Sequence, residues 1–451
     1  PKPGLCIKIV CVGANTESMN ISEEKRISDF NCKFSADGKY FALVNLSTVH
    51  IYNTISFTSL RTCRVREKID YLSWSPNSLY FMCGIRNMGA VYAWSIEDPK
   101  WMCKITEGSI GLVTSFWSPD SMCIITVAGL KVRMTIWSLK KDEALHTKCI
   151  KNLACCKFSK DGKRFAFIDT SSKDDMLCIS SCSTWSLLQK FSLPSKLCEG
   201  IEWSPDSEYI AIWDGITEFH LHIYSVLGKQ TASLKRNSQI GIEMICWSPS
   251  SQFLTIASAD AQLFLVNNVT WNMLNLTQDT LLYNDDILLL RETVSGEAFT
   301  SSLSAEGILP EVVSQYEKYK TEVSKIDYPL KDKSEWSEIS WMSYSSDGQL
   351  LAHSPSIYPN LIYIWNATNW TLTHVLSHLT PLKCITWDPV QTRLGIAANN
   401  NKVYFWTPSD TAIILIPDSN NFKIQNIEWS HSGTSMLVNS RDKLRIIYLT
   451  N

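Results

Sequence analysis

The chain has 451 residues, of which 45% are hydrophobic and 19% charged, and its 42 basic and 44 acidic side chains give a formal net charge of −2. This is the composition of an ordinary globular protein, long enough for one large core or several small units. So even a balance excludes the strong single-sign field that draws a protein onto nucleic acid or an anionic membrane. Tryptophan is the unusual component, with 17 residues.

Residues 1–18 are treated as an N-terminal extension of uncertain origin. The apolar stretch "LCIKIVCVG" at 5–13 is too short to span a bilayer, and it lacks a clear signal-peptide cleavage site. Met19 opens "MNISEEKRIS", which we take as the start of the folded part. The 15 cysteines are irregularly spaced and predict a reduced, cytosolic protein.

A short sequence motif recurs along the chain, for example "LSWSPNSLYFMCG" at 72–84 and "IEWSPDSEYIAIW" at 201–213. The aromatic residue before each turn recurs after 40, 43, 41, 45, 44, 97, 43 and 42 residues. A period of roughly 40–45 residues is typical of WD-type propeller blades. The nine aligned aromatics are expected to pack between blades: Phe34, Trp74, Trp117, Phe158, Trp203, Trp247, Tyr344, Trp387 and Trp429.

Each unit has the order of a small sheet. The aromatic ends a first strand, and a turn such as "SPDS" or "SADG" follows. A nearly continuous apolar run predicts a second strand that is buried on both faces. The blades are divergent, because only His378 keeps the histidine that WD repeats carry before the first strand, and only Asp260 and Asp442 keep the later turn aspartate.

The fold class predicted is therefore all-β, a WD40-type β-propeller with one large ring of about nine divergent blades. The blades occupy 19–274 and 336–451. The interval 275–335 is irregular, and we favour an insertion over a degraded tenth unit, with strands at 286–295 and 318–330 around a loop at 296–311. The last unit stops after three strands, so the strand predicted at 21–28 is expected to close the ring.

Signs of chemistry are sparse. The sequence has no nucleophile elbow, Walker loop or dinucleotide fingerprint, so no catalytic or cofactor-binding residue is predicted. His220 and His222 share one face of a strand, but no third ligand stands at a defined spacing, and no metal site is predicted. The pairs Cys155–Cys156 and Cys178/Cys182 are interpreted as small buried side chains.

Three stretches carry a more specific resemblance: "WSIEDPKWMCKITEGSIGLV" (94–113), "GIEWSPDSEYIAIWDGITEFHLHIYSVLG" (200–228) and "WSPSSQFLTIASADAQLFLVNNVTWNML" (247–274). They resemble the WD-repeat family of centriolar satellites and spindle poles. The resemblance runs from Met19 to the C-terminus and is poor only over 296–335.

The resemblance implies a non-enzymatic adaptor in the cytoplasm and cytoskeleton, at the centrosome, spindle pole or basal body. Its partners would be a coiled-coil microtubule-anchoring protein, a minus-end-directed kinesin and the γ-tubulin machinery, with no nucleic acid and no membrane. It would tether microtubule minus ends and support spindle organisation and cilium assembly. Two other classes stay open: a large-propeller translation-initiation factor that binds the ribosome, and a propeller enzyme with a metal or carboxylates in its channel.

The partner surface is placed on one rim of the ring. Loops containing Glu107 and containing Trp213, Asp214 and Glu218 are expected to open on the same face. An aromatic side chain among carboxylates suits a partner helix with a basic face. The competing interpretation is that Trp213 only packs between blades.

Overall fold

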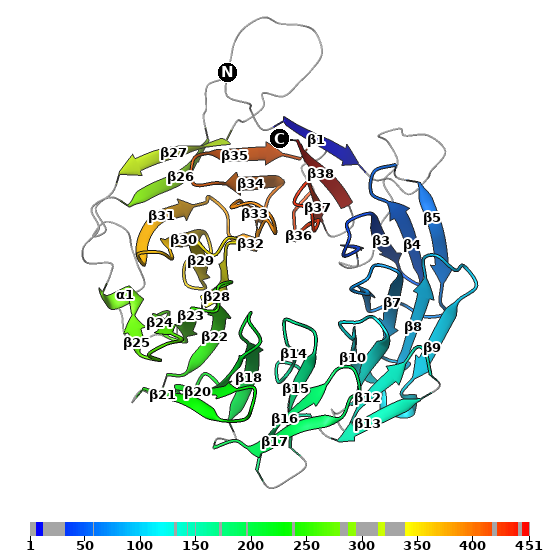
Figure 1. Ribbon diagram of the computed structural model, residues 1–451. Helices are drawn as coiled ribbons and strands as arrows, with labels where there is room; N and C mark the ends of the chain where they lie inside the picture. The colour runs from blue at the N-terminus through cyan, green and yellow to red at the C-terminus, as the bar shows by residue number, and fades with distance from the viewer. Residues whose placement is uncertain are drawn as a thin grey trace, which may run out of the picture.

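Nine sheets form the ring in the computed structural model (Figure 1). The structure describes residues 6–11, 32–56, 58–129, 133–141, 143–148, 150–170, 174–194, 197–236, 240–279, 287–294, 314–320, 339–416, 422–440 and 444–450. Eight sheets have four strands and one has six. The prediction of a single all-β ring of nine blades is confirmed.

The nine inner strands all end at the aromatic residues that the repeat predicts. They are β2 (Cys32–Phe34), β6 (Tyr71–Trp74), β10 (Leu112–Trp117), β14 (Cys156–Phe158), β18 (Cys198–Trp203), β22 (Ile242–Trp247), β28 (Ile339–Tyr344), β32 (Leu382–Trp387) and β36 (Asn426–Trp429).

The second and third strands of each blade form its buried centre. The second strands are β3 (Tyr40–Asn45), β7 (Tyr80–Ile85), β11 (Cys123–Ala128), β15 (Arg164–Asp169), β19 (Tyr209–Asp214), β23 (Phe253–Ser258), β29 (Leu350–Pro355), β33 (Leu394–Ala398) and β37 (Ser435–Asn439). The third strands are β4 (Thr48–Asn53), β8 (Ala90–Ser95), β12 (Arg133–Ser138), β16 (Met176–Ser181), β20 (His220–Ser225), β24 (Leu263–Asn267), β30 (Leu361–Asn366), β34 (Lys402–Trp406) and β38 (Leu444–Thr450).

The fourth strands lie toward the periphery of the ring. They are β5 (Ser59–Arg64), β9 (Met102–Thr106), β13 (Ala144–Lys148), β17 (Leu187–Ser192), β21 (Gln230–Lys235), β25 (Met273–Asn275), β31 (Thr371–Ser377), β35 (Thr411–Leu415) and, in the ninth blade, β1 (Cys6–Cys11). Outside the strands, the described residues include two short helical turns, η1 (Gly108–Ile110) and α1 (Leu276–Asp279).

At six of the nine seams between blades, the inner-strand aromatic also makes a hydrogen bond to the preceding blade. The indole N–H of Trp203 donates to the Lys157 carbonyl of the preceding blade at 3.1 Å, and Trp387 donates to Ser343 at 3.0 Å. Where tyrosine replaces tryptophan, the Tyr344 hydroxyl lies 2.5 Å from Thr255 Oγ1 across the same kind of seam. These aromatic side chains therefore lie between neighbouring blades, where the sequence predicts them to pack.

The turns after the inner strands add a second link. In eight of the nine turns the last residue has positive φ and is serine or glycine, for example Ser207 at 62° and Gly162 at 70°. The turn at 388–393 in the eighth blade has no such residue. The Ser207 hydroxyl accepts the backbone N–H of Asp161 in the preceding blade at 3.1 Å. A Cβ at Gly162 would lie 2.9 Å from Pro119 of its neighbour, so glycine stands where the preceding turn leaves no room.

Within the interval 275–335, two described strands join the seventh blade, and we call these two strands the insertion. The choice between an insertion and a degraded tenth unit for the whole interval stays a prediction. Strand β26 (Leu288–Val294) pairs in parallel with β31, and β27 (Ser314–Lys320) pairs with β26 to complete the six-stranded sheet. The strand predicted at 318–330 therefore begins earlier, while 321–330 and the loop predicted at 296–311 lie outside the described residues.

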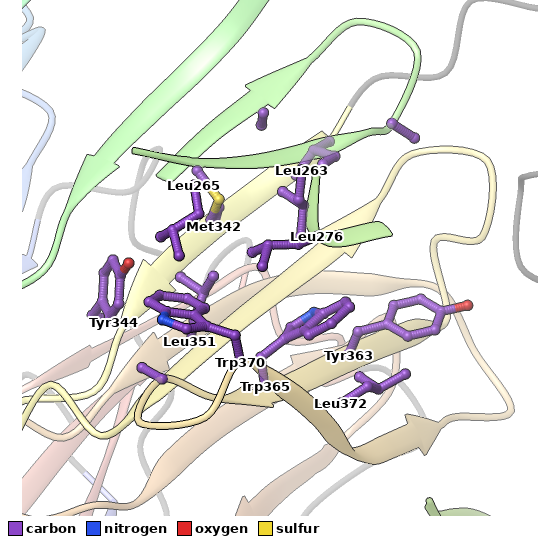
Figure 2. Close-up of a cluster of buried hydrophobic side chains, with 14 of the residues drawn as sticks. Leu263, Leu265, Leu276, Met342, Tyr344, Leu351, Tyr363, Trp365, Trp370 and Leu372 are labelled. Atoms are coloured by element: carbon purple, nitrogen blue, oxygen red, sulfur yellow. The ribbon is translucent and has the colours of Figure 1, made fainter. Parts of the chain in front are cut away.

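The sixth and seventh blades stay packed despite the insertion. Figure 2 shows Leu263 and Leu265 of the sixth blade facing Met342 and Tyr344 of the seventh. Leu276 of α1 also enters this cluster and is fully buried. The insertion therefore does not disrupt the packing between the sixth and seventh blades.

The strand that closes the ring differs from the one predicted. Strand β1 pairs antiparallel with β38 over six residues, from Cys6 opposite Thr450 to Cys11 opposite Arg445 (Figure 1). Closure by an N-terminal strand is thus confirmed, but the prediction that 21–28 supplies this strand is wrong, because residues 6–11 supply it. Residues 21–28 lie outside the described residues.

A truncation tests this closure. Removing residues 1–12 deletes β1 and exposes the edge of β38, so we expect a lower melting temperature and aggregation through the unpaired edge. Removing only residues 1–4 leaves β1 in place and serves as the control. Equal melting temperatures and equal elution on size exclusion for the two truncations would contradict the pairing.

The seam aromatics give a second test. Trp203 is fully buried, so Trp203→Ala is expected to lower the free energy of unfolding by about 3–5 kcal/mol. Trp203→Phe keeps most of the packing and should lose about 1 kcal/mol with the hydrogen bond. Chemical denaturation measures both. Trp74 is less buried than Trp203. If Trp74→Ala lowered the free energy of unfolding as much as Trp203→Ala, burial would not be what determines the loss of stability.

Candidate functional site

One face of the ring carries the loops that join consecutive blades and the turns between second and third strands. We call this the loop face. Backbone hydrogen bonds join the inter-blade loops to these turns. The Ile69 N–H donates to the Leu46 carbonyl at 2.8 Å, and the Glu107 N–H donates to the Gly89 carbonyl at 2.8 Å. The prediction that these segments open on one face is therefore correct.

Glu107 does not present its carboxylate to solvent on this face. It is 3% exposed, accepts two hydrogen bonds from the Arg133 guanidinium at 2.8 and 3.1 Å, and accepts another from the Thr126 hydroxyl. The Thr126 hydroxyl in turn accepts the indole N–H of Trp137 at 2.8 Å. This chain of bonds holds the loop to the blade, so the expectation of an exposed binding carboxylate at Glu107 is wrong.

The sixth blade has a related pair with the charges exchanged. Asp260 in the turn accepts from Arg236 in the inter-blade loop at 3.1 Å. Arginine thus stands at the place in the loop where a regular WD repeat has histidine. Asp442, the other predicted turn aspartate, lies outside the described residues.

The insertion is anchored on the loop face by Glu292 of β26, a residue that the sequence analysis missed. Glu292 is 1% exposed and accepts from Lys402 Nζ at 3.1 Å, the Tyr404 hydroxyl at 2.9 Å and the Leu379 N–H at 3.0 Å. A carboxylate inside the apolar run "LLLRETV" was the available signal. We call this group the Glu292 anchor.

A histidine completes the contact between insertion and ring. His378, singled out by the repeat, lies between the seventh and eighth blades, and its Nε2 is 2.6 Å from the Tyr316 hydroxyl of β27. Burial lowers the pKa of His378 to about 4, so the imidazole is neutral at ordinary pH. The histidine position that is typical of WD repeats therefore has a structural role in this protein.

Trp213 lies in β19, and Glu218 lies in the turn between β19 and β20. Trp213 is half-buried and lies against Gly200, where an added Cβ would come within 2.2 Å of the indole ring. Gly200 lies on β18 of the same blade, but Trp213 also packs against the cluster that the fifth and sixth blades share, and this second contact agrees with packing between blades. The Glu218 side chain is 51% exposed and is available on the loop face. A partner-binding role for these two residues stays a prediction.

Asp214 is buried, which corrects the expectation of an exposed carboxylate there. It is 1% exposed, and its Oδ2 lies 3.0 Å from His220 Nδ1. Glu218 Oε2 lies 3.3 Å from the same nitrogen. The turn thus gathers two carboxylates around one imidazole, an arrangement that the spacing of His220 and His222 did not suggest.

A different stretch of the loop face combines exposed apolar and basic side chains. We call it the basic rim, and it consists of Leu46, Arg66, Lys68, Arg86, Met88 and Ile110. Leu46, Met88 and Ile110 are 56%, 46% and 44% exposed. The segments are contiguous, because the Arg86 N–H donates to Asp70 Oδ2 at 2.7 Å and the Leu112 N–H to the Arg86 carbonyl at 3.3 Å. Arginine and methionine are enriched at protein interfaces.

The cysteines singled out in the sequence are packing residues. Cys155, Cys178 and Cys182 are buried and Cys156 is half-buried, all as free thiols. Burial raises the pKa of Cys156 and Cys182 to about 12 and that of Cys178 to about 11. Since metals bind the thiolate, such protonated thiols are poor ligands.

The fold and these loop networks define a WD-repeat β-propeller, a class that serves in general as a platform for protein interactions. The chain belongs to the WD-repeat protein family: it is 32% identical over 447 residues to mouse WD repeat-containing protein WRAP73, across 96% of each chain. It is also 24% identical over 269 residues to an uncharacterized WD repeat-containing protein of Schizosaccharomyces pombe, covering 55% of this chain and 52% of that one.

Other comparisons bear on the fold alone. The C-terminal WD40 domain of Sif2 is similar with a TM-score of 0.51 at 11% identity, over 96% of this chain and 98% of that one. No protein-family model matches the chain. Among the described residues, none of the helices has the length and apolar character that crossing a membrane requires.

The Glu292 anchor predicts a specific pH dependence. Burial opposes ionisation of Glu292, but the Leu379 N–H, Lys402 and Tyr404 outweigh it and hold the pKa below its ordinary value of 4.5. The anchor therefore stabilises the fold above that ordinary value, and the stabilisation is lost as the pH falls through the lowered pKa. Glu292→Gln should cost about 1.5–3 kcal/mol near neutral pH.

Thermal unfolding across an acid titration measures this effect. The difference between Glu292→Gln and the parent should shrink as the pH falls. Glu317→Gln makes the same change at an exposed position of β27 and should shift stability by less than about 0.5 kcal/mol. A pH-independent difference at Glu292 would mean that its charge does not stabilise the anchor.

Proposed function

We propose that this protein is a non-enzymatic adaptor at the centrosome, spindle pole or basal body that docks a coiled-coil protein anchoring microtubule minus ends. The similarity to WRAP73 over 96% of both chains is the observation that carries the proposal, because it includes the divergent blades and not only the repeat. The three quoted stretches that resemble the centriolar-satellite family support it. A minus-end-directed kinesin and the γ-tubulin machinery are further partners in this proposal.

The basic rim is the docking surface in this proposal. Its apolar side chains are already exposed and its backbone is held by inter-blade hydrogen bonds, so little ordering entropy is lost on binding. An amphipathic helix of a coiled coil would place apolar side chains on Leu46, Met88 and Ile110, and acidic side chains near Arg66 and Arg86. This reverses the charge of the partner helix expected from the sequence, because the carboxylates of Glu107 and Asp214 are buried.

A paired substitution tests the docking surface. Arg66→Glu with Met88→Asp changes one basic and one apolar exposed residue of the rim. If these are central contacts, the loss in binding should be about 2 kcal/mol or more, and the coiled-coil partner should disappear from affinity captures in dividing, ciliated cells. Recruitment of the tagged protein to the spindle pole should fall in parallel.

The opposite face offers a matched control. The turn between β20 and β21 contains Leu227, 81% exposed, and the exposed Lys229. Leu227→Asp with Lys229→Glu makes the same two kinds of change and should leave capture intact. A rim variant that melts like the parent and still captures the partner would exclude the rim. Capture of ribosomal proteins by the parent, with no pole localisation, would instead favour the translation-factor alternative.

A further inference from the structure

Asp214 differs from the other buried carboxylates among the described residues. Five of these lie against a lysine or arginine at 2.5 to 3.1 Å: Glu107 with Arg133, Asp169 with Lys190, Asp175 with Lys151, Glu292 with Lys402 and Asp388 with Arg393. Asp214 is equally buried, at 1% exposed, yet the cation recorded beside it is the imidazole of His220. A lysine or arginine is charged at any ordinary pH, whereas a histidine is charged only when protonated.

The carboxylate is also incompletely bonded. Its Oδ2 lies 3.0 Å from His220 Nδ1, but its Oδ1 is buried and has no hydrogen-bond partner in the described part of the chain. A buried carboxylate oxygen without a donor is costly, and a buried negative charge without a permanent counter-charge costs more. The site therefore lacks a positive charge that its five counterparts have.

The geometry around His220 suits a metal ion. One ligand atom each from Asp214, Glu218 and His220 lie within 4.8 Å of one another. Nδ1 is 3.0 Å from Asp214 Oδ2 and 3.3 Å from Glu218 Oε2. Zinc bonds of about 2.0–2.2 Å in a tetrahedron place ligand atoms roughly 3.3–3.6 Å apart, so small side-chain movements would bring all three onto one ion.

We propose that Asp214, Glu218 and His220 form a binding site for a divalent transition metal ion such as Zn²⁺. One imidazole with two carboxylates is a ligand set that suits zinc better than calcium or magnesium. The metal takes the place of the proton on Nδ1, and the imidazole then keeps its proton on Nε2. The ion supplies the permanent positive charge that Asp214 lacks.

The site has a consequence for the loop face. Its ligands come from the end of β19, the turn and the start of β20, so a bound ion would fix the conformation of this turn. Three protein ligands leave one tetrahedral position open, to water or to a side chain of a docked protein. Glu199 lies close by, since its Oε2 is 3.5 Å from the Cβ position of Gly215, and adds negative charge around the site.

Zinc titration of the metal-free, full-length protein tests the proposal. Isothermal titration calorimetry with Zn²⁺ alone should show one saturable site, and Zn²⁺ should raise the melting temperature. Glu218→Gln alters an exposed ligand without threatening the fold, and His220→Gln removes the nitrogen ligand. Each should weaken binding by at least the roughly 10–100-fold that outer-shell changes cost.

His146→Gln provides the matched control, because His146 is an exposed histidine of another blade. It should bind Zn²⁺ like the parent. The proposal is overturned if the parent shows no saturable binding of Zn²⁺. It is equally overturned if both ligand variants bind as tightly as the parent, which would place the zinc on other groups such as the thiols.

Discussion

The contact between one inner strand and the next is the interaction on which the whole ring depends. A four-stranded blade cannot bury both of its faces alone, so each must pack on its neighbours. The aromatic side chain at the end of each inner strand fills that seam, and several of the indoles also donate to a carbonyl of the preceding blade.

Much of the blade arrangement can be predicted from the sequence, because each repeat is formed by residues that are close together in the chain. The nine aromatics, the turn chemistry and the apolar second strands could all be predicted from spacing and residue type. The closing strand could not. Residues 6–11 and 21–28 are both short segments near the N-terminus, and the pairing of β1 with β38 joins residues at opposite ends of the chain. A pairing over such a distance leaves no local signal.

The side-chain contacts on the loop face could not be predicted from the sequence either. Sequence identifies Glu107 as a carboxylate in an inter-blade loop, but its partner Arg133 follows 26 residues later on another strand. Asp214, Glu218 and His220 are close in sequence, yet only the conformation of the turn brings their ligand atoms together. The basic rim was missed because its members come from three blades and none stands out alone.

The turns after the inner strands have a consequence for how such a ring can change over evolutionary time. At several turns the serine or glycine at the end matches the preceding blade: Ser207 accepts the N–H of Asp161, and Gly162 leaves room for Pro119. Blades of nearly identical shape are therefore not interchangeable. A duplicated, deleted or moved blade would therefore place its turn residues beside neighbours that they do not match on both sides.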